Sequence, residues 1–359
     1  MGNILLGALL GAVALGILWS ITTMGVFISY RILSIPDLTV QGSLVLGAGT
    51  AAVAIAAGFN PFLASLFAML AGMSAGIITG FLHTKLRIPA LLSGILCMIA
   101  LYSINLRVMS APNIPLLRVQ TVFSPIIDVI SRIDIINMAH ARNISVIITG
   151  LVFTVIVIAV VFWFFRTEIG NAIRATGNNI KMAKAQGVNT NISIMLGLTI
   201  SNGLVGLSGG LIAQNQGFSD IGMGEGAIVI GLACLFIGEV LFGKKNILRA
   251  LIAIVFGAII YRFIIALVLE AGMRASDLNL ITAAAVAIAL FFPTAKNLLS
   301  ARIKRSKEIG LIALINYCHE NGLLTTIRYC SKIGLRTLLN FKSRKGRGLV
   351  HLIKHQRSA

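Results

Sequence analysis

Long apolar runs, separated by short polar or turn-forming stretches, dominate the chain up to about residue 300. No charged residue occurs between Asp37 and Lys85, which leaves room for two spans divided by the turn-forming GFNP at Gly58–Pro61. A helix needs about 20 apolar residues to cross a bilayer. The pattern predicts nine spans, namely one within Gly2–Tyr30, two between Asp37 and Lys85, and Ile88–Leu106, Asn143–Phe165, Ile192–Ala213, Glu225–Phe242, Leu248–Leu269 and Leu278–Ala295.

These runs predict helices, because only helices and closed barrels satisfy the backbone in lipid and barrel strands are shorter and alternate. Composition agrees: 57% of the residues are hydrophobic and 11% are charged, with a mean hydropathy of +0.94. Soluble domains carry about 25% charged residues. We therefore predict an all-α polytopic membrane bundle of about 8–10 transmembrane helices. Its domain covers residues 1–300, with a short interfacial helix around Ile126–Met138.

Charge predicts the orientation of the bundle. Since no Lys or Arg precedes Arg31, we expect a retained first span with an outward-facing N-terminus. The loop Arg107–Arg142 is also basic, so the contrast between the two sides is moderate. By the positive-inside rule, the cytoplasmic side carries Arg31, Lys85, Arg87, Arg166, Arg174, Lys181, Lys184, Lys244, Lys245 and Arg249.

The last 59 residues, 301–359, form a second predicted unit. They hold 13 Lys and Arg residues and two acids, and most of the formal net charge of +19 resides there. We predict a basic cytoplasmic extension that either contacts anionic membrane lipids or has no specific role, with no nucleic-acid partner. Its Cys and His residues lack the paired spacing of zinc sites, so no metal is expected.

Small residues recur at four-residue spacing in two spans. Gly72, Gly76 and Gly80 form one series, and Gly206 and Gly210 form another. Such spacing lets helix backbones approach closely. We interpret both series as packing surfaces.

One polar segment, TEIGNAIRATGNNIKMAKAQGVNT at Thr167–Thr190, interrupts two apolar spans. Thr167 is suited to cap a helix that ends at a left-handed Gly177, and Asn179 is suited to cap a second helix that ends at Gly187. Small apolar faces are expected at Ala172, Ile173, Ala183 and Ala185. The residues alone leave two interpretations open: a solvated loop, or a knob that docks into a partner.

The same segment resembles the cytoplasmic coupling loop of bacterial ABC importer permeases, in the branched-chain amino-acid and ribose permease family. GIITGFLHTKLRIPALLSGIL at Gly76–Leu96 and RILSIPDLTVQGS at Arg31–Ser43 are also similar to that family. ILCMIALYSINLRVMSAPNIPLL and GLACLFIGEVLFG resemble its tryptophan/tyrosine transport branch. The resemblance covers most of residues 1–300 and does not extend to the tail.

The resemblance implies a transport subunit and not an enzyme. It implies a separate ATPase chain that carries ATP and Mg, with no cofactor on this chain. It also implies a periplasmic or lipid-anchored solute-binding protein, a second permease copy in a homodimer, and a multi-pass location in the bacterial cytoplasmic (inner) membrane. The expected solute is a small molecule, namely an amino acid. The resemblance to the tryptophan/tyrosine transport branch implies an aromatic amino acid. The expected ATPase-coupling residues are Thr167, Glu168, Gly170, Ala172, Arg174, Ala175, Gly177, Asn178, Ala183 and Gly187.

Polar residues inside the spans are candidates for a translocation path, because polar side chains are tolerated where they face a cavity. They are Asp37, Gln41, Tyr102, Ser103, Asn105 and Asn202. Hydrogen bonding between helices is an equally weighted alternative.

Other features bear on competing functions. Arg262, deep in a span, is expected to face the bundle or to pair with an acid such as Glu270 or Glu239. GEVLFGKK at Gly238–Lys245 is rejected as a phosphate-binding loop, since it ends an apolar span and has Lys245 where a hydroxyl is required. The alternative functions are a secondary transporter or a membrane scaffold that recruits a cytoplasmic partner.

Overall fold

The computed structural model describes residues 2–117, 119–131, 138–243 and 246–270, together with positions 284 and 287. All of them belong to one compact unit, Met1–Leu290. Its α-helices are α1 (Gly2–Val26), α2 (Thr39–Ala56), α3 (Pro61–Thr84), α4 (Ala90–Met109), α5 (Ser124–Ser131), α6 (Met138–Phe164), α7 (Glu168–Asn178), α8 (Ile180–Ala185), α9 (Thr190–Gln216), α10 (Ala227–Phe242) and α11 (Ile247–Glu270). Shorter elements are the π-helix η1 (Phe27–Ile32), the 3-10 helix η2 (Ile221–Gly224) and the strands β1 (Asn113–Pro115) and β2 (Phe218–Asp220).

Eight helices within the described residues are long and apolar enough to cross a membrane. They are α1 with η1, α2, α3, α4, α6, α9, α10 with η2, and α11. The chain is therefore a multi-pass helical membrane protein, as the apolar runs predict. The predicted ninth span, Leu278–Ala295, lies outside the described residues apart from positions 284 and 287, and the extension 301–359 lies wholly outside them.

The break between α2 and α3 lies where GFNP predicts it. Gly58 adopts a left-handed backbone with φ +88°. The Asn60 side chain then accepts a hydrogen bond of 2.9 Å from the Phe62 N–H, and Pro61 occupies the first position of α3. Both residues are suited to a helix start, because Asn supplies the missing acceptor and Pro needs no donor.

The tightest packing lies where α9 passes α2 and α3. A Cβ at Gly72 would lie 3.1 Å from the Gly206 Cα, and a Cβ at Gly76 would lie 2.7 Å from the Thr199 Cα. The predicted packing role of the glycine series is thus confirmed. Because glycine has no side chain, the backbones of these helices approach closely. Helix α9 lies at the centre of the bundle.

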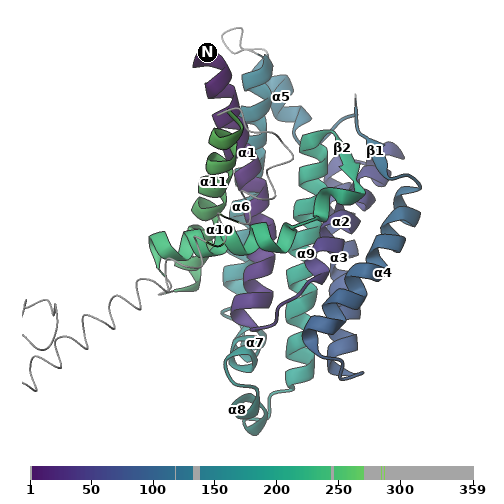
Figure 1. The fold of residues 1–359 in the computed structure, drawn as a ribbon, viewed down its shortest axis with the longest axis vertical. Helices are drawn as coiled ribbons and strands as arrows, with labels where there is room; N and C mark the ends of the chain where they lie inside the picture. Colours follow the sequence, from purple (N-terminus) through teal and green to yellow (C-terminus); the bar gives the residue numbers. More distant parts are fainter. Residues whose placement is uncertain are drawn as a thin grey trace, which may run out of the picture. The chain divides into compact units, whose positions relative to one another are not determined.

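The two ends of the bundle differ in structure (Figure 1). At one end β1 and β2 pair antiparallel, with Ile114 opposite Ser219. At the other end α7 and α8 project beyond the spans. The predicted interfacial helix is present in part as α5, and its predicted second half falls mostly outside the described residues.

Candidate coupling site

The first short helix of the polar segment begins as expected. The Thr167 Oγ1 accepts a hydrogen bond of 3.3 Å from the Gly170 N–H and so caps α7. Glu168 lies in the first turn, where the helix dipole favours an acid.

The second helix, α8, also has the expected ends. The Asn179 Oδ1 accepts a 3.1 Å hydrogen bond from the Met182 N–H. Gly187 follows the helix with φ +82°, and the Val188 N–H donates to the Ala183 carbonyl at 3.0 Å. The segment is therefore two capped helices and not an irregular loop.

The predicted role of Gly177 is wrong. Helix α7 continues through Asn178, and Gly177 does not have a positive φ. Its α-carbon instead abuts the Ile32 carbonyl at the end of η1, where any Cβ would collide with that oxygen. Beside it, the Ser34 Oγ donates a 3.3 Å hydrogen bond to the Gly177 carbonyl. Gly177 thus attaches α7 to the spans.

The predicted apolar face is wrong in part, because two of its four members point into the protein. Ile173 and Ala183 are fully buried, Ala172 is half-buried and Ala185 is exposed. Ile173 belongs to the main core. Buried apolar positions on α7 and α8 therefore hold the segment against the bundle.

Three other apolar side chains of the segment are exposed. Ile169, Ile180 and Met182 are 53%, 48% and 42% exposed. Sequence reasoning missed all three, and helical spacing could not have separated Ile169 from Ile173, because residues four apart fall on one face of a helix and only tertiary packing buries the second of them. These three side chains are the large exposed apolar groups of an otherwise polar segment.

The expected coupling residues divide between this outer surface and the attachment. Arg174 is exposed and its Nη1 lies 3.4 Å from the Asn171 Oδ1. Exposed members are Glu168, Arg174, Asn178 and Gly187; half-buried members are Thr167, Ala172, Ala175 and Gly177; buried members are Gly170 and Ala183.

An ion pair continues the attachment to the next span. The Arg31 Nε of η1 lies 3.1 Å from the Glu239 Oε1 of α10. The short element η1 therefore contacts both α7, at Gly177, and α10, at Glu239.

Of the two expectations for Arg262, the one that it faces the bundle is confirmed, and the one that it pairs with an acid is wrong. Neither Glu270 nor Glu239 forms an ion pair with it in the part of the chain that the structure describes. The Arg262 guanidinium lies over the Trp19 ring, 4.7 Å from its centroid. A π face partly compensates a cation that has left water.

Two of the path candidates meet in a buried hydrogen-bond network. The Asn202 Nδ2 donates to the Asp37 Oδ2 at 2.7 Å, and the Ser43 Oγ donates to the Asn202 Oδ1 at 2.7 Å. The Thr39 N–H donates to the Asp37 Oδ1 at 2.9 Å. Burial raises the pKa of the Asp37 carboxyl, and the hydrogen bonds from Thr39 and Asn202 oppose that rise. The network joins the start of α2 to α9.

The other path candidates lie apart from this network. The Asn105 Nδ2 donates to the Gly42 carbonyl at 3.2 Å, and Asn105 is buried. Gln41 is half-buried, whereas Tyr102 and Ser103 are exposed on α4. These exposed polar groups are available to a path or to a second copy.

The GEVLFGKK stretch has no phosphate-binding geometry at its start. Gly238 lies inside α10, and a Cβ there would lie 2.7 Å from the Ala253 carbonyl carbon. Among the residues that the structure describes, no group of three or more His, Cys, Asp or Glu side chains could hold a metal.

Comparison with known proteins identifies the family. Residues 8–293 match the family described as branched-chain amino acid transport system, permease component. The tyrosine transport system permease protein of Clostridioides difficile (strain R20291) is 39% identical over 290 residues, which cover 81% of this chain and 92% of the relative. An uncharacterized protein of Rickettsia prowazekii (strain Madrid E) is 35% identical over 271 residues, covering 74% and 91%.

A more distant relative is named for the import of a different kind of solute. The autoinducer 2 import system permease protein LsrC of Yersinia enterocolitica (serotype O:8 / biotype 1B, strain NCTC 13174 / 8081) is 27% identical over 222 residues, covering 60% of this chain and 57% of the relative. No solved structure matches the chain. The chain belongs to the branched-chain amino acid transport system permease family.

Proposed function

We propose that this chain is the membrane-spanning subunit of an ATP-binding-cassette importer in the bacterial cytoplasmic (inner) membrane. The observation that carries the proposal is the segment α7–α8. It is anchored by Ile173, Gly177 and Ala183 and presents Ile169, Ile180 and Met182 outward. A separate ATPase would dock on that face, bind ATP and Mg, and move the segment. This chain would supply the path and catalyse no reaction.

Co-purification tests the docking face. We would purify the chain from its native membrane in mild detergent, identify co-eluting ATPases, and repeat with Ile169→Glu combined with Met182→Glu. Charges placed at an apolar contact remove its hydrophobic contribution and leave desolvated carboxylates. The control is Leu117→Glu, which changes an apolar residue that is 77% exposed. Leu117 lies at the other end of the bundle, because the N–H of its neighbour Leu116 donates a 2.7 Å hydrogen bond to the carbonyl of Gly217, at the end of α9.

The expected result is an ATPase that elutes with the normal chain and with the control but not with the double variant. Retention of the ATPase by the double variant would show that docking lies elsewhere. Absence of any ATPase, together with uptake driven by an ion gradient, would establish the alternative of a secondary transporter. Recruitment of a cytoplasmic protein without uptake would establish the alternative of a scaffold.

We further propose an aromatic amino acid as the solute, delivered by an extracellular binding protein. The relative named as a tyrosine transport permease supports this class, and its 39% identity exceeds the 27% of the autoinducer 2 permease. Uptake of labelled tyrosine by native membrane vesicles, with leucine and ribose as competitors, tests it. Competition by ribose and not by aromatic amino acids would contradict the assignment.

A further inference from the structure

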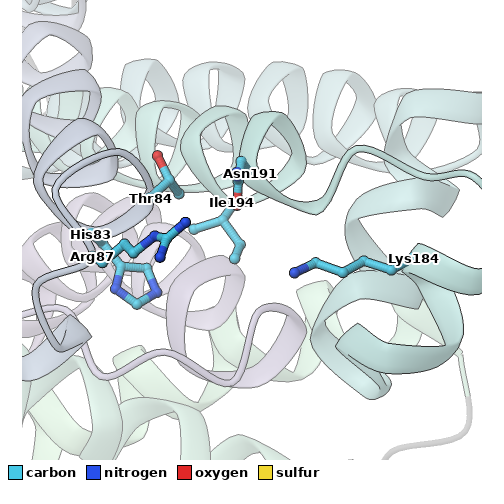
Figure 2. A pocket seen from close by; sticks show the side chains of 6 residues that line it. All are labelled: His83, Thr84, Arg87, Lys184, Asn191 and Ile194. Carbon is cyan, nitrogen blue, oxygen red and sulfur yellow. The ribbon is translucent and has the colours of Figure 1, made fainter.

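A pocket of about 370 Å³ opens between the bundle and α8. Figure 2 shows Lys184 extended from α8 toward Arg87, with His83 beside Arg87. Three lining residues are basic and none is acidic. The lining comes from the end of α3, the loop after it, α8 and the start of α9, and comprises His83, Thr84, Arg87, Lys184, Asn191 and Ile194.

The basic groups have no acidic partner. Neither Arg87 nor Lys184 makes an ion pair with a residue that the structure describes. The His83 Nδ1 donates to the Ile88 carbonyl oxygen at 2.8 Å, and this hydrogen bond fixes the ring. Cationic groups that converge without a counter-charge repel one another, and an anion placed between them removes that repulsion.

A helix start adds to this preference. Asn191 and Ile194 lie in the first turns of α9, a helix of 27 residues whose Asn189 cap satisfies the Ile192 N–H at 3.3 Å. The positive end of the helix dipole favours a negative charge. The pocket is thus suited to a phosphate group.

The surroundings of the pocket favour a phosphate that carries acyl chains. Phe81, Leu86 and Ile192, which adjoin lining residues in the chain, are 48%, 56% and 49% exposed. Phe81 and Ile192 belong to helices long enough to cross a membrane, and Leu86 lies two residues after the end of one. Basic pockets at the cytoplasmic ends of such helices bind anionic lipid headgroups.

We propose that this pocket binds the headgroup of an anionic phospholipid, with its phosphate between Arg87 and Lys184. The bound headgroup would link α8 to the end of α3. This site does not depend on the transport function and is separate from the outward face of Ile169, Ile180 and Met182.

Binding of defined lipids to the purified full chain in neutral detergent tests the proposal. The probes are short-chain phosphatidylglycerol, short-chain phosphatidylcholine and inorganic phosphate, titrated by thermophoresis. The pocket variants are Arg87→Gln and Lys184→Gln. Their matched controls are Lys85→Gln and Lys181→Gln, which remove the same charge from exposed neighbours that do not line the pocket. The basic tail is present in every sample and contributes equally.

We expect each pocket variant to weaken phosphatidylglycerol binding about fivefold, as the loss of one lipid-contacting basic residue does. The controls should bind as the normal chain does, and phosphatidylcholine and phosphate should bind more weakly. An equal loss of binding in the controls would show that diffuse surface charge accounts for lipid binding, and it would contradict the proposed pocket. Phosphate binding as tight as phosphatidylglycerol would overturn the lipid assignment, and unchanged binding by the pocket variants would overturn both.

Discussion

The Asp37 carboxyl shows what a single polar residue does in this bundle. It is 1% exposed, and both of its oxygens accept hydrogen bonds, from Thr39 and Asn202. It lies before α2 and close to Gly94 of α4, and its hydrogen bonds join the start of α2 to α9. Its hydrogen bonds therefore favour the structural alternative for Asp37 and Asn202, while a role in the path remains a prediction.

Removal of this carboxyl should destabilise the protein. Asp37→Ala leaves the Asn202 amide and the Thr39 N–H without their acceptor, at a cost of about 1–3 kcal/mol. Asp37→Asn keeps one acceptor oxygen and should cost less. The apparent unfolding temperature of each purified variant measures the effect, and equal temperatures for Ala and Asn variants would contradict it.

The same residue predicts a dependence on pH. Burial raises the pKa of Asp37 above its usual value of 3.8, so the folded chain binds this proton more tightly than the unfolded chain. The resulting stabilisation is complete below the unfolded pKa and is lost as pH rises through the folded pKa. The unfolding temperature of the normal chain should therefore fall more steeply from about pH 4 upward than that of Asp37→Asn. Parallel curves for the two proteins would show that Asp37 does not titrate differently on folding.

Gly177 permits a test of how the coupling segment is attached. Gly177→Val would press against the Ile32 carbonyl, and such overpacking costs about 1–3 kcal/mol. We expect faster hydrogen exchange at the amides of α7 and α8. Gly7→Val is the matched control, since a Cβ at Gly7 meets nothing within 4 Å. Unchanged exchange in the Gly177 variant would mean that the segment is held by other contacts.

At the scale of elements, the contact between α3 and α9 organises the bundle. Glycines from both helices bring their backbones together over several turns. Both helices also contribute to the same buried network, since Thr79 of α3 lies 2.8 Å from Thr39 through their hydroxyls. A change in the spacing of this helix pair would therefore disturb α2 as well.

Gly76→Val should separate these helices. The added side chain would collide with the Leu198 carbonyl and the Thr199 Cα, at a cost of about 1–3 kcal/mol or more. Ile77→Val, on the exposed side of the same helix, is the control. Thermal unfolding in detergent should show a lower midpoint for Gly76→Val alone. A midpoint equal to that of the control would mean that the helices readjust without loss.

At the scale of the whole molecule, α4 carries two polar side chains on a mostly apolar outer surface, where Leu92, Leu96 and Ile99 are also exposed. Tyr102 and Ser103 are exposed there, within a span of 20 residues. Polar groups inside spans normally face a cavity or another helix. We therefore expect this surface to face the second copy in the proposed homodimer.

Cysteine crosslinking tests that arrangement. The tail cysteines Cys318 and Cys330 are first changed to Ser, and Cys97 and Cys234 are buried. Ser103→Cys should then form disulfide-linked dimers in native membranes. Ile156→Cys, on the exposed surface of α6, should not. Crosslinking at residue 156 and not at 103 would reverse the assignment of the two surfaces.

Local sequence signals predicted many features of the coupling segment. Thr167, Asn179 and Gly187 are cap residues, and caps depend on neighbours within a few positions. The role of Gly177 could not be predicted from such local signals. It depends on Ile32, which lies far away in the chain and becomes a neighbour only on folding.

The sequence by itself determined the helical membrane class, the positions of eight spans and the existence of two capped helices between α6 and α9. These follow from hydrophobic length and from local hydrogen bonding. Tertiary structure alone decided which apolar residues of α7 and α8 face outward, that Glu239 pairs with Arg31, and that Arg262 lies over Trp19. Such pairings depend on which distant helices pack side by side, and the periodicity of one helix carries no information about its neighbours.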